Sequence, residues 1–139
     1  MTRRRYDSHG TEFGNWIREQ DDLDSSYGYT ATDLDYVWRN YKNSKWMMIE
    51  EKRKMSKMRR AQSESHRFLD GACKANNHYF GFHLLQFENT CPEDGKIYWN
   101  TWEITKAGLI NNFQMLTRLP GYFDLAATGS LSTQQQQTQ

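Results

Sequence analysis

The sequence predicts a mixed α/β or α+β layer fold, in which helices flank a central β-sheet with both parallel and antiparallel strands. Apolar residues recur at helical spacing in three segments, and strand-like segments joined by short polar turns lie between them. The 139 residues suffice for one hydrophobic core, and the aromatic fraction of 14% provides bulk to fill it.

The first half of the chain predicts one helix and one hairpin. The expected order is helix, loop, strand, turn and strand, at residues 11–20, 21–28, 29–41, 42–44 and 45–54. Phe13, Trp16 and Ile17 fall on one helical face, and Thr11 can cap the start of this helix. The polar turn between the two apolar runs indicates a hairpin.

The second half predicts a helix, a second hairpin and a final helix. A change to helical spacing at Met55 starts a helix that should end near Gly71 or Asn76. Its expected apolar face consists of Met55, Met58, Ala61, Phe68, Leu69 and Ala72. The hairpin strands are expected at residues 78–88 and 96–103. The final helix, residues 105–116, should bury Leu109, Ile110, Phe113 and Leu116.

Composition divides the chain into three parts. A basic arm is expected at residues 1–10, a single domain at 11–127 and a disordered tail at 128–139. The arm is polar and contains three consecutive arginines, and the tail is a low-complexity, Gln-rich run that cannot build a packed core.

The cysteines and histidines predict neither a disulfide framework nor a zinc site. Cys73 and Cys91 are the two cysteines, and they lack CxxC spacing. His66, His78 and His83 do not combine with them in a familiar zinc pattern. We therefore expect His83 to be a packed residue and Cys73 to be a buried, inert thiol, as suits a reducing compartment.

No segment predicts membrane insertion. No apolar run approaches the roughly 18 residues that a membrane helix requires. Residues 1–10 lack the apolar centre of a signal peptide. The expected location is cytoplasmic, or the cytoplasm of the host cell if the protein is encoded by a phage.

The formal net charge of +1 hides a segregated pattern. Acidic residues gather at 19–24 and basic residues at 52–60. A local basic segment can attract a polyanion even when the total charge is near zero.

Acidic and basic side chains recur at alternate positions of the first two expected strands. Asp33 and Asp35 should project to one face, as should Glu50 and Lys52. Carboxylate oxygens suit Mg²⁺, which retains waters that can become nucleophiles. Two alternatives stay open: the aspartates are solvated residues on an exposed strand, or residues 50–54 form a salt-bridged strand end that limits aggregation.

This arrangement resembles the PD-(D/E)XK nuclease superfamily. The resemblance depends on an acidic residue in the first helix, an Asp on one strand and Glu-x-Lys on the next, followed by a helix. The resemblance covers about residues 11–75 and is nearest to Holliday-junction-resolvase-like and phage-type endonucleases. It implies a restriction-endonuclease-like core of order αβββαβ and hydrolysis of DNA with Mg²⁺ or Mn²⁺ as cofactor.

The resemblance assigns roles residue by residue. Asp35 and Glu50 are implied to bind the metal ion, and Lys52 to orient or activate the attacking water. Glu12 matches a first-helix carboxylate that related members add to the catalytic, metal-binding set. Asp33 is the alternative to Asp35, although the second Asp of this pattern is the usual ligand. Glu12 has a structural alternative, because a carboxylate is favourable at the start of a helix.

The basic segment is implied to hold the DNA backbone. The residues expected to bind DNA are Arg53, Lys54, Lys57, Arg59, Arg60 and Gln62. Gln62 is included because some branches of the superfamily carry a Gln on this helix. Such contacts supply affinity but little sequence discrimination. The alternative is a solvated helix face with no partner.

The predicted function is therefore a metal-dependent endonuclease that cleaves DNA phosphodiester bonds. The small size leaves little room for a separate recognition domain, which favours structure-selective processing of junctions, flaps or nicks. A homodimer would supply two cuts. The alternative is a non-catalytic nucleic-acid-binding protein, or a phage assembly protein, with a nuclease-like fold.

Overall fold

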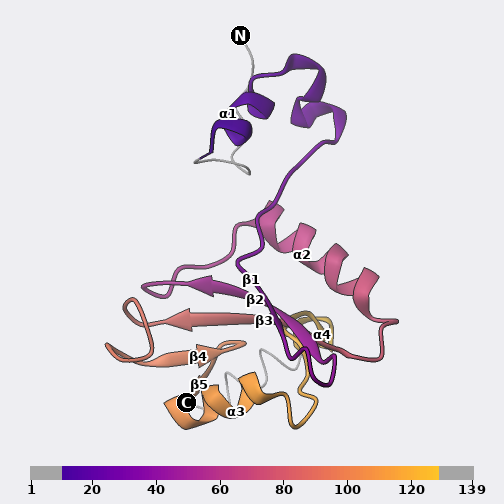
Figure 1. Cartoon of the computed structure of the whole chain (residues 1–139). Coiled ribbons are helices and arrows are strands. Elements are labelled where there is room, and N and C mark those ends of the chain that lie inside the picture. The colour runs from indigo at the N-terminus through magenta and orange to yellow at the C-terminus, as the bar shows by residue number, and fades with distance from the viewer. Residues whose placement is uncertain (1–10, 129–139) are drawn as a thin grey trace.

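A five-stranded mixed β-sheet forms the centre of the computed structural model, which describes residues 11–128 (Figure 1). The strands are β1 (Tyr36–Arg39), β2 (Trp46–Lys52), β3 (Tyr79–Phe87), β4 (Ile97–Trp99) and β5 (Trp102–Ile104). The helices are α1 (Glu12–Arg18), α2 (Arg60–Cys73), α3 (Lys106–Gln114) and α4 (Tyr122–Thr128), with short 3₁₀ helices at Asp21–Leu23 and Ser25–Tyr27. The predicted mixed α/β class, with helices beside a mixed sheet, is confirmed.

The strands lie in the order β1-β2-β3-β4-β5. β2 and β3 are parallel, and the other neighbouring pairs are antiparallel. A parallel pair requires a crossover connection, which α2 provides. Two strands precede this crossover helix, whereas the superfamily resemblance implied three. The structure therefore shows a mixed sheet but not the restriction-endonuclease-like order.

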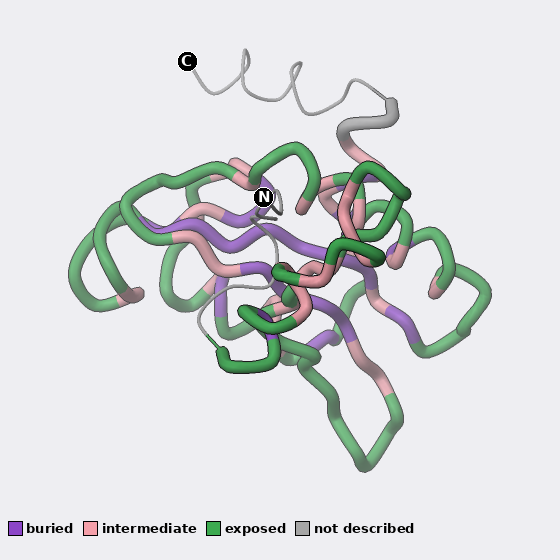
Figure 2. Tube along the Cα trace, turned by 90° about the horizontal axis from the view of Figure 1, so that it is seen from above, coloured by how far each residue is buried: buried purple, intermediate pink, exposed green. Residues whose placement is uncertain are grey.

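Helices α2 and α3 lie on opposite sides of the sheet, and each covers its own set of buried side chains (Figure 1). The α3 side contains Met47, Ile49, Leu85, Phe87, Ile97, Trp99, Leu109 and Met115. The α2 side contains Met48, Tyr79, Phe82 and Phe123, with Leu69 and Cys73 packed against them. Buried residues accordingly run along the central strands, and the loops around them are exposed (Figure 2).

The first hairpin and the crossover helix are shorter than predicted. β1 begins at Tyr36, so both Asp33 and Asp35 lie outside the strand, and the prediction that they alternate along it is wrong. α2 begins at Arg60 because Lys54 and Met55 adopt left-handed backbone angles that interrupt a helix. Met55 and Met58 are thus not on a helical face, although Met58 packs beside the α2-side core.

The predicted apolar face of α2 is also wrong at Phe68, which is 78% exposed. His66 and Asp70 are the buried residues of this helix, four positions apart on one face. Phe68 lies between them in sequence and therefore points away from the sheet. The helix buries polar side chains where the sequence predicted an aromatic one.

Helix α1 forms as predicted, but it does not join the core. The Thr11 hydroxyl accepts a hydrogen bond from the Gly14 backbone N–H at 2.9 Å and caps the helix. Phe13 and Trp16 remain largely exposed and stack on each other, with ring centroids 6.0 Å apart. α1 lies apart from the sheet, beyond an extended segment that leads into β1 (Figure 1).

The C-terminal part adds elements that the sequence did not predict. The segment expected as one strand at 96–103 is divided by a tight turn, in which Asn100 and Thr101 have φ of 51° and 75°. α3 forms and buries Leu109, but Ile110 and Leu116 are exposed. α4 follows it and ends at Thr128, so this first residue of the predicted tail is helical. The predicted arm at 1–10 and the rest of the tail lie outside the described residues.

Candidate active site

The candidate site lies at the C-terminal end of β2, on the side of the sheet that α2 covers. Glu50 and Lys52 project to the same side, as strand alternation predicts. Glu50 is only 2% exposed, and the Lys52 ammonium lies 3.6 Å from its Oε2. Burying a carboxylate removes it from water, which lowers the folding stability unless the ammonium and further polar groups compensate for the lost hydration.

Asp35 is held against the same strand end. Its Oδ2 accepts a hydrogen bond of 2.8 Å from the backbone N–H of Glu51. Partial removal from water raises the pKa of Asp35, and the neighbouring Glu50 and Glu51 charges raise it further, against the effects of the Glu51 N–H and of Lys52. Asp35 therefore lies at the strand end beside Glu50, although like Asp33 it is exposed to solvent.

Helix α2 contributes two polar side chains that face Glu50. The Gln62 amide donates a hydrogen bond of 2.6 Å to Glu50 Oε2. His66, one turn later on the same face, places its Nε2 3.3 Å from Glu50 Oε1. Gln62, which the sequence predicts as a DNA contact, holds the carboxylate in this structure. His66 was not predicted to be part of the site.

The site contains buried polar atoms with unused hydrogen-bonding capacity. Glu50 Oε1, Gln62 Oε1 and His66 Nε2 have no hydrogen-bond partner within the described part of the chain. Glu50 Oε1 and His66 Nε2 lie 3.3 Å apart, which is within ion-pair distance, although the contact lacks hydrogen-bond geometry. Unpaired buried groups are uncommon in folded proteins, and Trp99 Nε1 and Thr101 Oγ1 are further examples in the described part of this chain.

The donors present are compatible with a hard divalent cation. Asp35 and Glu50 provide carboxylate oxygens, and Mg²⁺ is commonly held by one or two carboxylates together with waters and substrate phosphates. Within residues 11–128, no group of three or more His, Cys, Asp or Glu side chains is spaced to hold a metal ion. Any ion bound here would therefore take only part of its ligands from these acidic side chains.

The other histidine of the buried core is structural. His83 is 1% exposed, its Nε2 lies 2.9 Å from the Phe80 carbonyl, and its Nδ1 lies 3.0 Å from the Asn100 amide nitrogen. Both ring nitrogens are satisfied if His83 is neutral, with Nε2 donating and Nδ1 accepting. Burial lowers the pKa of His83 to about 4, which is consistent with this neutral form.

Glu12 is not brought to the site. It is the first residue of α1, is exposed, and lies with that helix away from the sheet (Figure 1). The structure supports its alternative role in the first turn of a helix, where a carboxylate interacts favourably with the helix dipole.

The predicted DNA-binding residues form an exposed basic connection from β2 to α2. Arg53, Lys54, Lys57 and Arg59 precede the helix, and Arg60 is its first residue. Arg53 pairs with Glu51 at 3.3 Å, and Arg60 pairs with Glu64 at 3.2 Å. The basic residues thus lie mostly on a loop, not on the predicted helix face, and they follow directly after Lys52.

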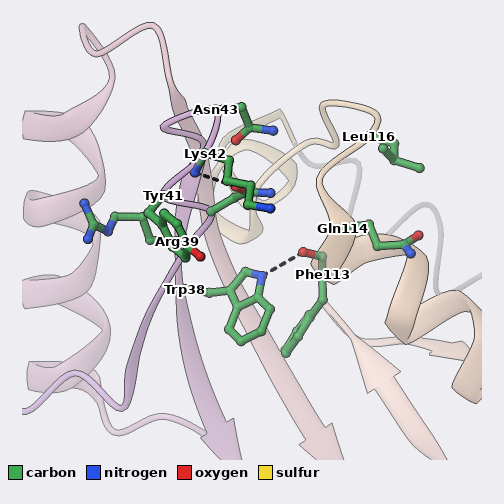
Figure 3. Close-up of a pocket in the computed structure, with 9 residues that line it drawn as sticks. Trp38, Arg39, Tyr41, Lys42, Asn43, Phe113, Gln114 and Leu116 are labelled. Carbon is green, nitrogen blue, oxygen red and sulfur yellow. Dashed lines mark hydrogen bonds between the residues drawn. The ribbon is translucent and has the colours of Figure 1, made fainter.

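A separate cavity of about 540 Å³ lies between the β1–β2 turn and the C-terminal end of α3 (Figure 3). Trp38 lines it and donates a hydrogen bond of 2.7 Å from Nε1 to the Phe113 carbonyl. The cavity lies at the opposite end of β1 from Asp35, so it is distinct from the candidate site.

Comparisons with protein-family models, curated protein sequences and solved structures find no match for this chain. Among the residues that the structure describes, no helix is both long and apolar enough to cross a membrane.

Proposed function

We propose that this chain is a metal-dependent nuclease that hydrolyses DNA phosphodiester bonds, with Mg²⁺ or Mn²⁺ as cofactor. The observation that carries the proposal is the meeting of two carboxylates and one ammonium at the end of β2. Asp35 and Glu50 interact electrostatically there, and Lys52 lies 3.6 Å from Glu50. These three residue types in one place suit phosphodiester hydrolysis better than a structural salt bridge, which needs only two partners.

Each side chain has a defined task in this proposal. Asp35 and Glu50 would hold the metal ion, which supplies charge neutralisation at the phosphate and lowers the pKa of a bound water. Lys52 stabilises negative charge that develops on the phosphate, or positions the attacking water. Gln62 holds Glu50 through Oε2, and His66 Nε2 lies 3.3 Å from Oε1.

The exposed basic connection would hold the DNA backbone beside this site. Lys57, Arg59 and Arg60 are exposed and follow Lys52 within a few residues. Phosphate contacts position the duplex without reading its bases. The proposal is therefore for cleavage that depends on DNA structure, such as a junction, flap or nick, more than on sequence.

The proposal is tested with the full chain on duplex, nicked, flap and four-way-junction DNA, with Mg²⁺ or Mn²⁺. Glu50→Gln should abolish cleavage and retain DNA binding, because it removes a charged ligand but keeps the volume and a hydrogen-bond acceptor. Glu103→Gln, the same change at an exposed position of β5, is the matched control and should cleave normally.

Two results would count against the proposal. Cleavage by Glu50→Gln at the wild-type rate would exclude Glu50 as a ligand. Wild-type protein that binds DNA but cleaves none of the four substrates with either metal would favour the non-catalytic alternative.

A further inference from the structure

The cavity between the β1–β2 turn and the C-terminal end of α3 has a lining that the proposed cleavage chemistry does not use (Figure 3). Its aromatic side chains are Trp38, Tyr41 and Phe113, and its cations are Arg39 and Lys42. Three amides and a leucine complete the lining, and no carboxylate of the described residues belongs to it. Its volume of about 540 Å³ is within the range of ligand sites.

We propose that this cavity binds unpaired bases of a DNA strand, with an aromatic ring stacked on a base and the two cations beside the phosphates. This inference deepens the proposed nuclease function and rests on it for DNA as the ligand. It names the substrate class as DNA with a single-stranded segment, such as a flap. It also places the recognition of that segment at the other end of β1 from Asp35.

Trp38 is held in place before any ligand binds. Its Nε1 donates a hydrogen bond of 2.7 Å to the Phe113 carbonyl, and its ring lies against the Phe113 ring with centroids 5.0 Å apart. The side chain is nevertheless 44% exposed, whereas tryptophan is highly buried on average. A fixed ring with exposed surface can stack on a base with little further loss of conformational freedom.

Tyr41 supplies a second aromatic ring that the fold does not need. It is 78% exposed, and its hydroxyl makes no hydrogen bond within the described part of the chain. Removing this side chain should therefore leave the packing of the sheet unchanged. Every base has a π-face, so stacking on such a ring tolerates any DNA sequence.

The cations of the cavity are not neutralised by the protein. Neither Arg39 nor Lys42 makes an ion pair within residues 11–128. Arg60, by contrast, pairs with Glu64 at 3.2 Å. Two unpaired positive charges beside aromatic rings complement a ligand that carries negative charge next to flat rings, as a nucleotide does.

The end of α3 is adapted to a negative ligand. The last carbonyls of a helix carry partial negative charge, which would repel a phosphate. Here the Phe113 carbonyl accepts the Trp38 hydrogen bond, and the Met115 carbonyl accepts one of 2.9 Å from Lys45 Nζ. Both carbonyls are thus engaged by the protein, and Lys45 adds positive charge at this helix end.

An unpaired strand fits this lining better than a duplex or a peptide. Stacking requires the faces of the bases, which neighbouring base pairs cover in a duplex. A peptide would need acidic side chains matched to both cations, whereas a DNA strand carries a negative charge with every base. Blunt duplex DNA should therefore bind through the basic connection and not through the cavity.

The first test is fluorescence anisotropy of the full chain without divalent metal, on a labelled single strand and on the blunt duplex of the same sequence. Tyr41→Ala should weaken single-strand binding by at least about fivefold, the size of one base–aromatic stack, and duplex binding much less. Tyr41→Phe keeps the ring and should bind like the wild type. Tyr27→Ala, at a tyrosine that is 71% exposed and outside the cavity, is the matched control and should also bind like the wild type.

The second test uses unmodified protein, so it does not depend on the folding of any variant. A single strand containing 5-iodouracil is crosslinked to the wild-type chain by light, and mass spectrometry should find the modification at Trp38 or Tyr41. Crosslinks confined to residues outside the cavity would overturn the inference. So would wild-type single-strand affinity in Tyr41→Ala, which is the result expected of a cavity that takes a peptide.

These outcomes are separate from the fate of the nuclease function. A wild-type chain that cleaves DNA but gives no crosslink in the cavity would overturn the inference and leave the nuclease function standing. A crosslink at Trp38 or Tyr41 in a protein that cleaves no DNA would support the cavity as a single-strand site and refute the nuclease function.

Discussion

Replacing Lys57, Arg59 and Arg60 together with Ala should weaken binding to all DNA sequences and flatten its salt dependence. Each phosphate contact contributes about 0.9 to the log–log slope of affinity against salt, so three lost contacts lower it by about 2.7. Between 50 and 200 mM salt, wild-type affinity should therefore fall about 40-fold more than that of the variant.

The helix should survive this change. Arg59 is the residue before α2, and its side chain makes no capping hydrogen bond. The Arg60–Glu64 pair is highly exposed, so its loss costs little. Ala is also a better helix former than Arg at the first helical position.

The assay is fluorescence anisotropy with labelled duplexes of two unrelated sequences over a salt series. Lys42, Lys96 and Lys106, replaced together with Ala, form a control with the same change in net charge. These three lysines lie outside the connection from β2 to α2, so this control should retain the wild-type slope. An unchanged slope in the first variant would mean that the basic connection is only solvated and that DNA binds elsewhere.

Three further predictions concern single residues. Lys52→Ala should bind DNA almost normally but cleave poorly in single-turnover assays, because the variant lacks the Lys52 ammonium that lies beside Glu50. Equal losses of binding and cleavage would indicate that Lys52 makes a simple phosphate contact. Thr101→Gly should raise the free energy of unfolding by about 1 kcal/mol in urea titrations, because it removes a β-branched residue at φ 75° and a buried, unpaired hydroxyl. If Thr101→Gly is no more stable than Thr101→Ala, the strain attributed to the backbone is refuted. The lowered pKa of His83 means that the folded state binds a proton less readily than the unfolded state. The free energy of unfolding should therefore fall by about 3 kcal/mol between pH 6.5 and 4. A His83→Phe variant with the same pH dependence would contradict this.

The sequence predicted the types of the main elements better than their limits. Thr11 as a helix cap was read correctly because capping depends on local chemistry. The start of α2 was misplaced because left-handed angles at Lys54 and Met55 carry no glycine signal. α4 was missed because a seven-residue helix is too short to show a clear period.

The site was predictable only where neighbours in sequence are neighbours in space. Glu50 and Lys52 share a side of β2 by strand alternation, which needs no tertiary knowledge. The position of His66 depends on which face of α2 is turned toward the sheet. It also depends on the crossover between the parallel strands β2 and β3, which places this helix against β2. Glu12 was inferred from resemblance, and the extended segment after α1 takes it away from the sheet.

The two sides of β2 have different surroundings. Met47 and Ile49 of β2 pack toward α3, while Met48 and Glu50 face the other way, toward α2. Substitutions among the buried residues under α3 should therefore alter melting temperature while metal affinity stays constant. Under the proposed function, the buried residues beneath α3 can therefore change without altering the groups around Glu50, as long as that core stays packed.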